Sequence, residues 1–148
     1  MTSTAPVADG AAAHPGALFT GDTLFVGGVG FFFEGTAVDM VAVVRKLLAA
    51  VPDPATQLYC GHDYALDFLP TAAKRDPTNA AVAARLRWAE TARAEGRPAM
   101  PTTMADELAT NYFVRCVTHT AQTGALYPSW NAASNDVPAL LALVYDSF

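Results

Sequence analysis

Two short apolar runs separated by one amphipathic segment constrain the fold of this chain more than any other feature. The runs cover residues 17–20 and 57–60, and a glycine followed by a polar residue ends each of them. Runs of this length with polar turns at their ends are typical of buried strands. The segment between them has a helical pattern, so the arrangement predicts a βαβ-like unit in which the helix covers the sheet.

The helix of this unit is expected to begin after Thr36. Thr36 and Asp39 have the Thr-x-x-Asp spacing of an N-terminal cap. Pro52 is expected to end the helix, because proline lacks the backbone N–H that a further turn needs. The apolar residues between these limits recur at spacings of three and four and predict one buried stripe: Met40, Val43, Val44, Leu47, Leu48 and Val51.

The second half of the chain has a helical pattern from Ala65 onward. Residues 79–97 predict one helix, a further helix follows the capping residues Thr102 and Thr103, and residues 136–143 predict a last short one. The chain is therefore expected to have an α/β (α+β) fold in three parts. These are a flexible lead-in at residues 1–16, an αβ domain at residues 17–70 and a helical domain at residues 71–148.

Composition and charge exclude several classes of protein. A chain with 52% hydrophobic and 16% charged residues is too apolar to be disordered throughout. Its formal net charge of -5 argues against a general nucleic-acid binder, which must neutralise phosphate. Eight of the nine basic residues lie between Arg45 and Arg97, where they form either a local basic face or the solvated side of helices.

The sequence also shows no mark of a membrane or secreted protein. Glycine and charged residues interrupt every apolar stretch well before the roughly 20 residues that a membrane span needs. No lysine or arginine precedes Arg45, so no basic start of a secretory signal or transit peptide is visible. Two cysteines, Cys60 and Cys116, cannot form a disulfide framework. We therefore expect a cytoplasmic protein without membrane or nucleic-acid partners.

One aspartate and one histidine closely follow the two predicted strands. Asp22 comes after the first run and His62 after the second, at the carboxyl ends where sheet proteins place ligand-binding groups. A carboxylate and an imidazole that meet there are suitable ligands for zinc or iron. Each residue also has a simpler interpretation, since aspartate is a common turn former and a lone histidine is commonly a surface residue.

Several short motifs follow one another between residue 18 and about residue 116. They are Phe-Thr-Gly-Asp-Thr-Leu-Phe at 19–25, Phe-Glu-Gly-Thr at 33–36, Tyr-Cys-Gly-His-Asp-Tyr at 59–64, Asp-Pro-x-Asn-Ala-Ala at 76–81, Leu-x-Trp-Ala at 86–89, Pro-Thr-Thr-Met-Ala-Asp-Glu at 101–107 and Asn-x-Phe-x-Arg at 111–115. In this order they resemble glyoxalase II, the hydroxyacylglutathione hydrolase of the metallo-β-lactamase superfamily.

The resemblance implies a fold, a reaction and three site residues. The fold would be the second half of a metallo-β-lactamase αββα sandwich followed by the helical domain typical of glyoxalase II. Asp22 would be the carboxylate that bridges two metal ions, zinc or iron, and His62 a ligand of the second ion. Tyr64 would contact the glutathione part of a small-molecule thioester. The family hydrolyses S-D-lactoylglutathione to glutathione and D-lactate, with the metals activating a water molecule.

The chain departs from the family in its metal ligands. The family's principal metal motif, Thr-His-x-His-x-Asp-His, is absent from this sequence. A dinuclear site of the family uses more histidines than the three in the chain, which are His14, His62 and His119. His14 lies too close to Asp22 to match the family's pattern and His119 lies beyond the matched motifs, so we expect neither to be a ligand.

The substrate side departs from the family as well. Phe31 and Phe33 stand where the family commonly has lysine and tyrosine, and residues 140–148 lack the arginine and lysine that the family places near the C-terminus. Without these donors, charge-assisted binding of glutathione is not expected, and a less anionic thiol carrier would fit better. Phe31 and Phe33 are candidate substrate contacts, with core packing or a partner surface as the alternative.

Three explanations fit these departures. In the first, the chain is a truncated part of a glyoxalase II-like hydrolase whose upstream half supplies the metal motif. In the second, it is a non-catalytic binding or interaction module whose strand edges a homo-oligomer or another partner covers. In the third, it is an enzyme with a reduced site formed by Asp22, His62 and water. We prefer the first and expect weak or no hydrolase activity, because two protein ligands rarely hold a catalytic zinc.

Overall fold

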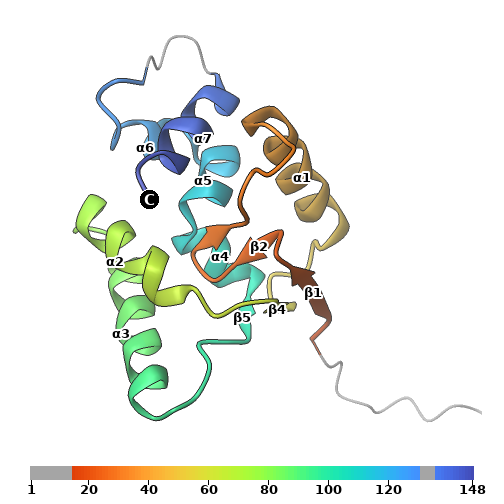
Figure 1. Cartoon of the computed structure of the whole chain (residues 1–148), viewed down its shortest axis with the longest axis vertical. Coiled ribbons are helices and arrows are strands. Elements are labelled where there is room, and N and C mark those ends of the chain that lie inside the picture. The colour runs from red at the N-terminus through yellow and green to blue at the C-terminus, as the bar shows by residue number, and fades with distance from the viewer. Residues whose placement is uncertain (1–14, 131–135) are drawn as a thin grey trace, which may run out of the picture.

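The computed structural model describes residues 15–130 and 136–148 and consists of short strands and helices (Figure 1). A three-stranded sheet has the order β1-β4-β5, with β1 at Ala17–Gly21, β4 at Gln57–Cys60 and β5 at Thr102–Thr103. A separate hairpin pairs β2 (Leu24–Phe25) with β3 (Gly28–Val29). The predicted α+β class is confirmed, while the αββα sandwich and the division into domains remain predictions. The predicted lead-in at residues 1–16 lies outside the described residues except for its last two.

The two apolar runs form parallel neighbouring strands, joined through the helix α1 (Ala37–Ala50). Leu18 pairs with Leu58 and Phe19 with Tyr59, so the predicted strand–helix–strand unit is confirmed. Because parallel strands run in the same direction, their carboxyl ends lie at one edge of the sheet. This edge is where Asp22 and His62 follow their strands.

The start of α1 is as predicted, but its buried face is rotated from the predicted stripe. Thr36 caps the helix, and its backbone N–H donates to Oδ2 of Asp39 at 2.8 Å. Val41, which the stripe omits, is buried beside Val44 because this side of α1 faces α5 and α7. Met40 and Val43 are only half-buried and border an open cavity. The predicted stripe therefore missed Val41, while its members Met40, Leu48 and Val51 do pack against the core.

Six further helices form the second half of the described chain: α2 (Ala65–Arg75), α3 (Ala80–Ala94), α4 (Met104–Thr110), α5 (Tyr112–Thr118), α6 (Thr120–Gly124) and α7 (Val137–Tyr145). The helices predicted within residues 79–97 and 136–143 are confirmed as α3 and α7. The strand β5 was not predicted. The sequence indicated only that Thr103 caps α4, whereas in the structure Thr103 also pairs with Gln57 of β4. None of the described helices is long and apolar enough to cross a membrane.

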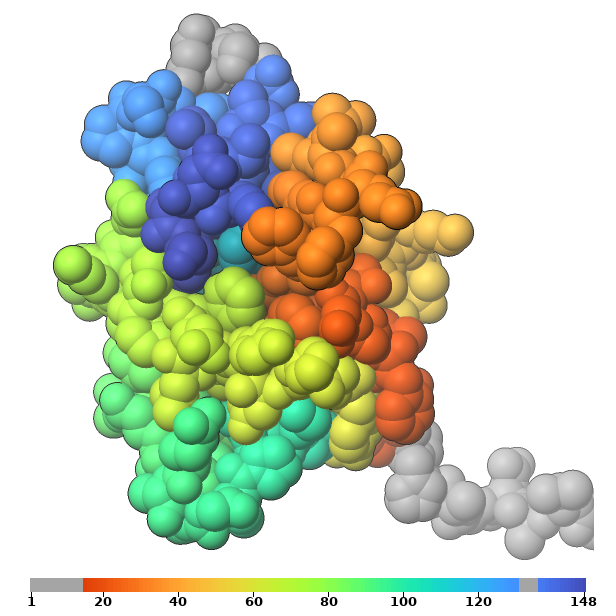
Figure 2. All heavy atoms as spheres, viewed as in Figure 1, coloured from red at the N-terminus to blue at the C-terminus, as the bar shows by residue number. Residues whose placement is uncertain are grey.

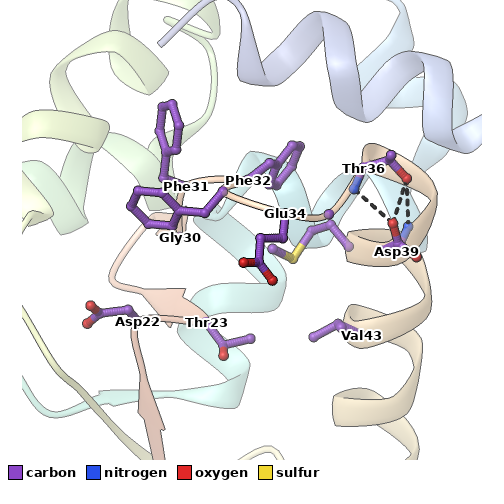
Figure 3. A pocket seen from close by; sticks show the side chains of 12 residues that line it. Asp22, Thr23, Gly30, Phe31, Phe32, Glu34, Thr36, Asp39 and Val43 are labelled. Atoms are coloured by element: carbon purple, nitrogen blue, oxygen red, sulfur yellow. Dashed lines mark hydrogen bonds between the residues drawn. The ribbon is translucent and has the colours of Figure 1, made fainter.

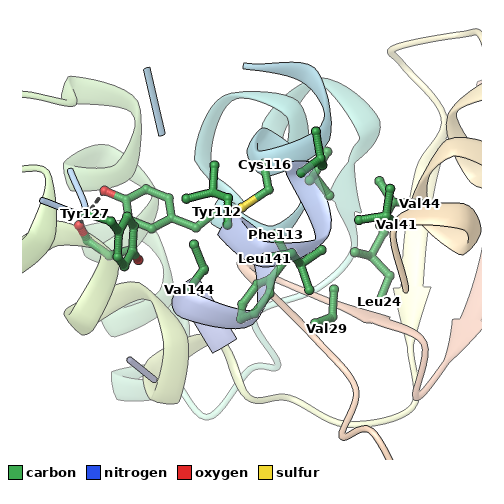
Figure 4. Packing of buried hydrophobic residues seen from close by; sticks show 14 of the residues in the cluster. Leu24, Val29, Val41, Val44, Tyr112, Phe113, Cys116, Tyr127, Leu141 and Val144 are labelled. Carbon is green, nitrogen blue, oxygen red and sulfur yellow. Dashed lines mark hydrogen bonds between the residues drawn. The ribbon is translucent and has the colours of Figure 1, made fainter. Parts of the chain in front are cut away.

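Two hydrophobic clusters hold the β2–β3 hairpin between the helices. The larger cluster joins α1, α5 and α7 and includes Leu24 and Val29 from the hairpin (Figure 4). The smaller cluster lies between α2 and α3 and includes Val26 from the hairpin turn. The hairpin thus lies between the two clusters and packs against both. It fixes the position of the residues on either side of it, Asp22 before and Phe31 after.

Candidate functional site

Asp22 and His62 meet at the carboxyl edge of the sheet. The Nε2 atom of His62 lies 3.5 Å from Oδ2 of Asp22, and the two side chains are 54% and 64% exposed, respectively. Each follows a glycine, and the N–H of Gly61 donates to the carbonyl of Gly21 at 2.8 Å. The structure therefore brings together the two residues predicted as ligands and leaves both open to solvent. Their role in binding metal stays a prediction.

Two glycines make room for Asp22. A Cβ atom at Gly61 would lie 2.4 Å from Oδ1 of Asp22, and one at Gly30 would lie 1.8 Å from the backbone carbonyl oxygen of Asp22. Both distances are shorter than a van der Waals contact, so a side chain at either position would displace Asp22. Glycine at position 61 therefore leaves space beside the carboxylate, and glycine at position 30 allows the close approach of the Asp22 backbone.

The donor atoms of the pair fit part of a metal site. One carboxylate and one imidazole are oxygen and nitrogen donors that zinc and iron accept. Within residues 15–130 and 136–148, no three His, Cys, Asp or Glu side chains are grouped so that they could hold a metal ion. His119 lies at the C-terminal end of α5, and His14 lies outside the described residues. The pair can supply two ligands, and a complete centre needs further donors.

Tyr64 links the pair to an aromatic surface. Its ring stacks on the His62 imidazole with 5.1 Å between centroids and 17° between planes. The Tyr64 ring also meets Phe25 of the hairpin edge-on at 5.1 Å, and Phe25 stacks against Phe68 of α2 at 6.4 Å. This position is compatible with the substrate contact predicted for Tyr64, which stays a prediction.

An open apolar cavity of about 370 Å³, here called the aromatic pocket, begins at Tyr64. It is lined by Phe25, Val29, Phe31, Tyr64, Phe68, Phe113, Tyr145 and Phe148. In Figure 2 the cyan atoms of α5 are visible in a hollow between the orange loop after the hairpin, the dark blue C-terminal helix and the yellow-green α2. Segments far apart in the sequence therefore form its walls.

Four of the lining residues were not predicted as site residues: Phe68, Phe113, Tyr145 and Phe148. Two spacings could have indicated some of them. Phe68 follows Tyr64 by four positions and Phe148 follows Tyr145 by three, which places each pair on one face of a helix or its end. Phe113 belongs to the Asn-x-Phe-x-Arg motif at 111–115, but nothing in that motif indicates that its ring lines a pocket.

Phe31 and Phe33 lie in the loop between the hairpin and α1. They are 69% and 86% exposed, so the alternative of core packing is wrong for both. The Phe31 ring lies 6.0 Å from the Tyr145 ring and lines the aromatic pocket. Phe33 lines a second cavity of about 350 Å³, which Figure 3 shows between Asp22 and α1 and which Phe31 also lines. Phe31 thus borders both cavities and Phe33 borders only the second.

A buried carboxylate holds the hairpin from the side of α4. Glu107 is fully buried and accepts three hydrogen bonds, from the backbone N–H of Gly27 at 2.9 Å, the Thr102 hydroxyl at 2.7 Å and the Asn111 amide at 2.9 Å. The Asn111 amide also donates to the hairpin carbonyls of Phe25 and Gly28, at 3.3 and 3.0 Å. Burial raises the pKa of Glu107, and the three hydrogen bonds oppose that rise.

Comparison with known proteins connects this chain to one family. A family model described as hydroxyacylglutathione hydrolase C-terminus matches residues 63–141. The hydroxyacylglutathione hydrolase of Alkalilimnicola ehrlichii is 47% identical over 123 residues, which is 83% of this chain and 46% of the relative. The cytoplasmic hydroxyacylglutathione hydrolase of Arabidopsis thaliana is 48% identical over 99 residues, 67% of this chain and 38% of the relative. The enzyme of that name from Halorhodospira halophila is 49% identical over 100 residues, 68% of this chain and 38% of the relative.

The chain spans less than half the length of these relatives. The family model begins at Asp63, directly after His62, so that match does not include the Asp22–His62 pair. It does include Tyr64, Phe68 and Phe113 of the aromatic pocket, while Tyr145 and Phe148 lie beyond its end. The chain belongs to the hydroxyacylglutathione hydrolase (glyoxalase II) family and carries its C-terminal part.

Proposed function

We propose that this chain is the C-terminal part of a glyoxalase II-like hydrolase of small-molecule thioesters. The observation that carries the proposal is the Asp22–His62 pair, 3.5 Å apart where two parallel strands end. Ligand-binding groups of α/β proteins gather at such edges. The names of the relatives, all hydroxyacylglutathione hydrolases, support a thioester as the substrate.

Four residues of the site would hold the metal and orient its ligands. Asp22 would hold metal through its carboxylate and His62 through Nε2, and zinc and iron both suit these donors. A bound ion would polarise the thioester carbonyl and activate a water molecule for hydrolysis. Gly61 leaves the Asp22 carboxylate free to reach an ion. Tyr64 holds the His62 ring by stacking and borders the space for the substrate.

The rest of the metal site must come from elsewhere. We assign β1, α1 and β4 to the second half of a metallo-β-lactamase αββα sandwich, at residues 17–70, and the later helices to the helical domain at residues 71–148. The two donors of the pair are fewer than the three protein ligands common in catalytic zinc sites. The missing ligands would lie outside the described residues or on another chain. By itself the chain should hydrolyse S-D-lactoylglutathione weakly or not at all.

A chimera with the Alkalilimnicola ehrlichii relative tests this proposal. This chain would replace the matching part of the relative, and metal content and thioester hydrolysis would be measured for the purified chimera. We expect bound metal and hydrolysis, both lost on Asp22→Asn or His62→Gln and both retained on His119→Gln. A folded chimera whose metal content is the same with and without Asp22 and His62 would contradict the proposal.

A non-catalytic interaction module is the second candidate function. It is favoured by the partly exposed apolar flank of α1, where Met40 and Val43 border the second cavity together with the exposed ring of Phe33. A second copy or another protein covering this face would require no metal. Sedimentation distinguishes the two functions: a stable metal-free oligomer of the isolated chain favours the module, and a metal-binding monomer favours the hydrolase.

A further inference from the structure

A continuous series of aromatic rings joins the Asp22–His62 pair to the aromatic pocket. The series begins with the His62–Tyr64 stack and continues through Phe25 to Phe68. From Phe68 it extends to Phe148 at 5.9 Å and to Phe113 at 6.1 Å. The pocket is lined by Tyr64, whose ring stacks on His62, so a ligand held in it would extend past Tyr64 to place its reacting group at the pair.

The far wall of the pocket is formed by the loop after the hairpin and by α7. Phe113 lies 6.2 Å from Tyr145, and Tyr145 lies 6.0 Å from Phe31. The backbone N–H of Phe32 donates to the Tyr145 hydroxyl at 3.3 Å, which ties the loop to the helix. This wall is held in place by contacts between residues more than one hundred positions apart, so the pocket is formed by the fold rather than by a single mobile segment.

The lining of the pocket determines which ligands it can hold. None of its eight lining residues carries a charge, and seven of them are aromatic. Transfer of a carboxylate or an ammonium group into such surroundings without a partner is strongly unfavourable. Apolar rings and branched alkyl groups are favoured there, at roughly 25 cal/mol for each Å² removed from water. The volume of about 370 Å³ lies in the range of small-molecule sites.

We propose that the aromatic pocket binds the aryl group in the acyl part of an uncharged thioester. The substrate class of this site is therefore thioesters that join an aryl-bearing acyl group to a neutral thiol carrier. This inference rests on the proposed hydrolase function. In the reaction, the oxygen of water bonds to the acyl carbon and the C–S bond breaks. The products are a carboxylic acid and a free thiol, which takes up a proton. The aryl group stays in the pocket while the carbonyl lies beside Asp22 and His62.

The test uses binding without hydrolysis. The probe is S-benzyl-N-acetylcysteamine, an uncharged thioether that water cannot cleave, and S-methylglutathione is the anionic comparison ligand. Both are titrated into the metal-free 148-residue chain by calorimetry, and aromatic proton signals of the protein are followed by NMR. We expect saturable binding of the benzyl thioether with shifts of the Phe31, Tyr145 and Phe148 signals, and at least tenfold weaker binding of S-methylglutathione.

Two variants of one exposed ring make the test specific. Phe31→Lys should weaken binding of the benzyl thioether about tenfold or more, because it places a charge at an apolar wall. Phe31→Ala should weaken it less, because only the ring is lost. Phe31 is 69% exposed, so both variants are expected to fold. Phe19→Lys and Phe19→Ala are the matched controls, since Phe19 is 77% exposed on β1 and does not line the pocket.

Three results would overturn the proposal. These are tighter binding of S-methylglutathione than of the benzyl thioether, unchanged binding in Phe31→Lys, and an equal loss in the Phe19 controls. Metal is absent throughout, so failure of this test leaves the Asp22–His62 pair as a metal site. Failure of the metal experiments would in turn leave the aromatic pocket as a binding site without hydrolysis.

Discussion

The side-chain amide of Asn111 lies 2.9 Å from Oε2 of Glu107, one helical turn earlier, and both groups are buried. Together they satisfy three backbone groups of the β2–β3 hairpin, the N–H of Gly27 and the carbonyls of Phe25 and Gly28. The Glu107–Asn111 pair therefore links α4 and α5 to the hairpin that separates Asp22 from Phe31. Removing this pair should lower the free energy of unfolding more than removing an ordinary helix cap does.

Asn111→Ala should lower the free energy of unfolding by about 2–4 kcal/mol, because it removes a cap and leaves buried polar groups unpaired. Asn79→Ala is the matched control. The side chain of Asn79 caps α3 by accepting hydrogen bonds from two backbone N–H groups, as that of Asn111 does for α5. Asn79 is only half-buried, so its substitution should lower the free energy of unfolding by about 1 kcal/mol. Urea unfolding of both variants measures the difference. Equal losses would mean that the hairpin contacts of Asn111 contribute nothing beyond the cap.

Glu107→Gln should change the pH dependence of stability. Burial raises the pKa of Glu107 above its usual 4.5, so the folded protein takes up a proton that the unfolded chain releases. The stability that this group contributes is complete below pH 4.5 and is lost as the pH rises through the folded pKa. The variant has no such loss, so its stability relative to the natural protein should increase above pH 4.5, by at most about 1.4 kcal/mol per pH unit. Unfolding curves from pH 4 to pH 8, chosen to span about four units, give this slope; a constant difference would contradict the shift.

The two thiols should react slowly and in a fixed order. Burial raises the pKa of the Cys116 thiol to about 12 and also raises the pKa of the half-buried Cys60 thiol. Because the thiolate is the reactive form, Cys60 should react slowly with Ellman's reagent and Cys116 only after unfolding. Cys60→Ser isolates the Cys116 signal. Comparable rates for both thiols in the folded chain would show that α5 opens readily around Cys116.

Gly61→Ala should disturb the Asp22–His62 pair with little loss of stability. The added Cβ would lie 2.4 Å from Oδ1 of Asp22, the end of a side chain that can rotate away. We expect a change in unfolding free energy within about 1 kcal/mol and a clear loss of metal affinity. Gly35→Ala is the control, because its nearest neighbours would be 3.7 Å away. Equal metal affinity in the natural chain and Gly61→Ala would show that the carboxylate needs no such space.

Much of the αβ part could be predicted from local sequence. The runs at 17–20 and 57–60 are strands, and Thr36 and Asp39 cap the helix between them, because these features depend on neighbouring residues. The meeting of Asp22 and His62 follows from parallel strands ending at one edge. The face of α1 could not be predicted from periodicity alone, since α5 and α7 determine which flank is covered.

The aromatic pocket and the buried network could not be predicted in this way. Glu107 and Asn111 belong to two of the quoted motifs, but the local sequence does not indicate that they bond to the hairpin, because their partners there lie about 80 positions earlier. Likewise, Phe31 meets Tyr145 only because α7 folds back against the loop. The resemblance indicated that the substrate side had lost its charged residues, but only the fold shows that aromatic rings from four regions of the chain gather there.

The most direct test of the central claim, that Asp22 and His62 bind metal together, is a zinc titration of the chimera with the Alkalilimnicola ehrlichii relative, followed by the imidazole NMR signals. We expect the His62 signals to shift on zinc addition while those of His119 do not, with each signal assigned by a His→Gln variant. Asp22→Asn should lower the zinc affinity measured from the His62 signals by more than the roughly 10–100-fold loss typical of removing an outer-shell partner. An unresponsive His62, or an identical response in Asp22→Asn, would contradict the claim.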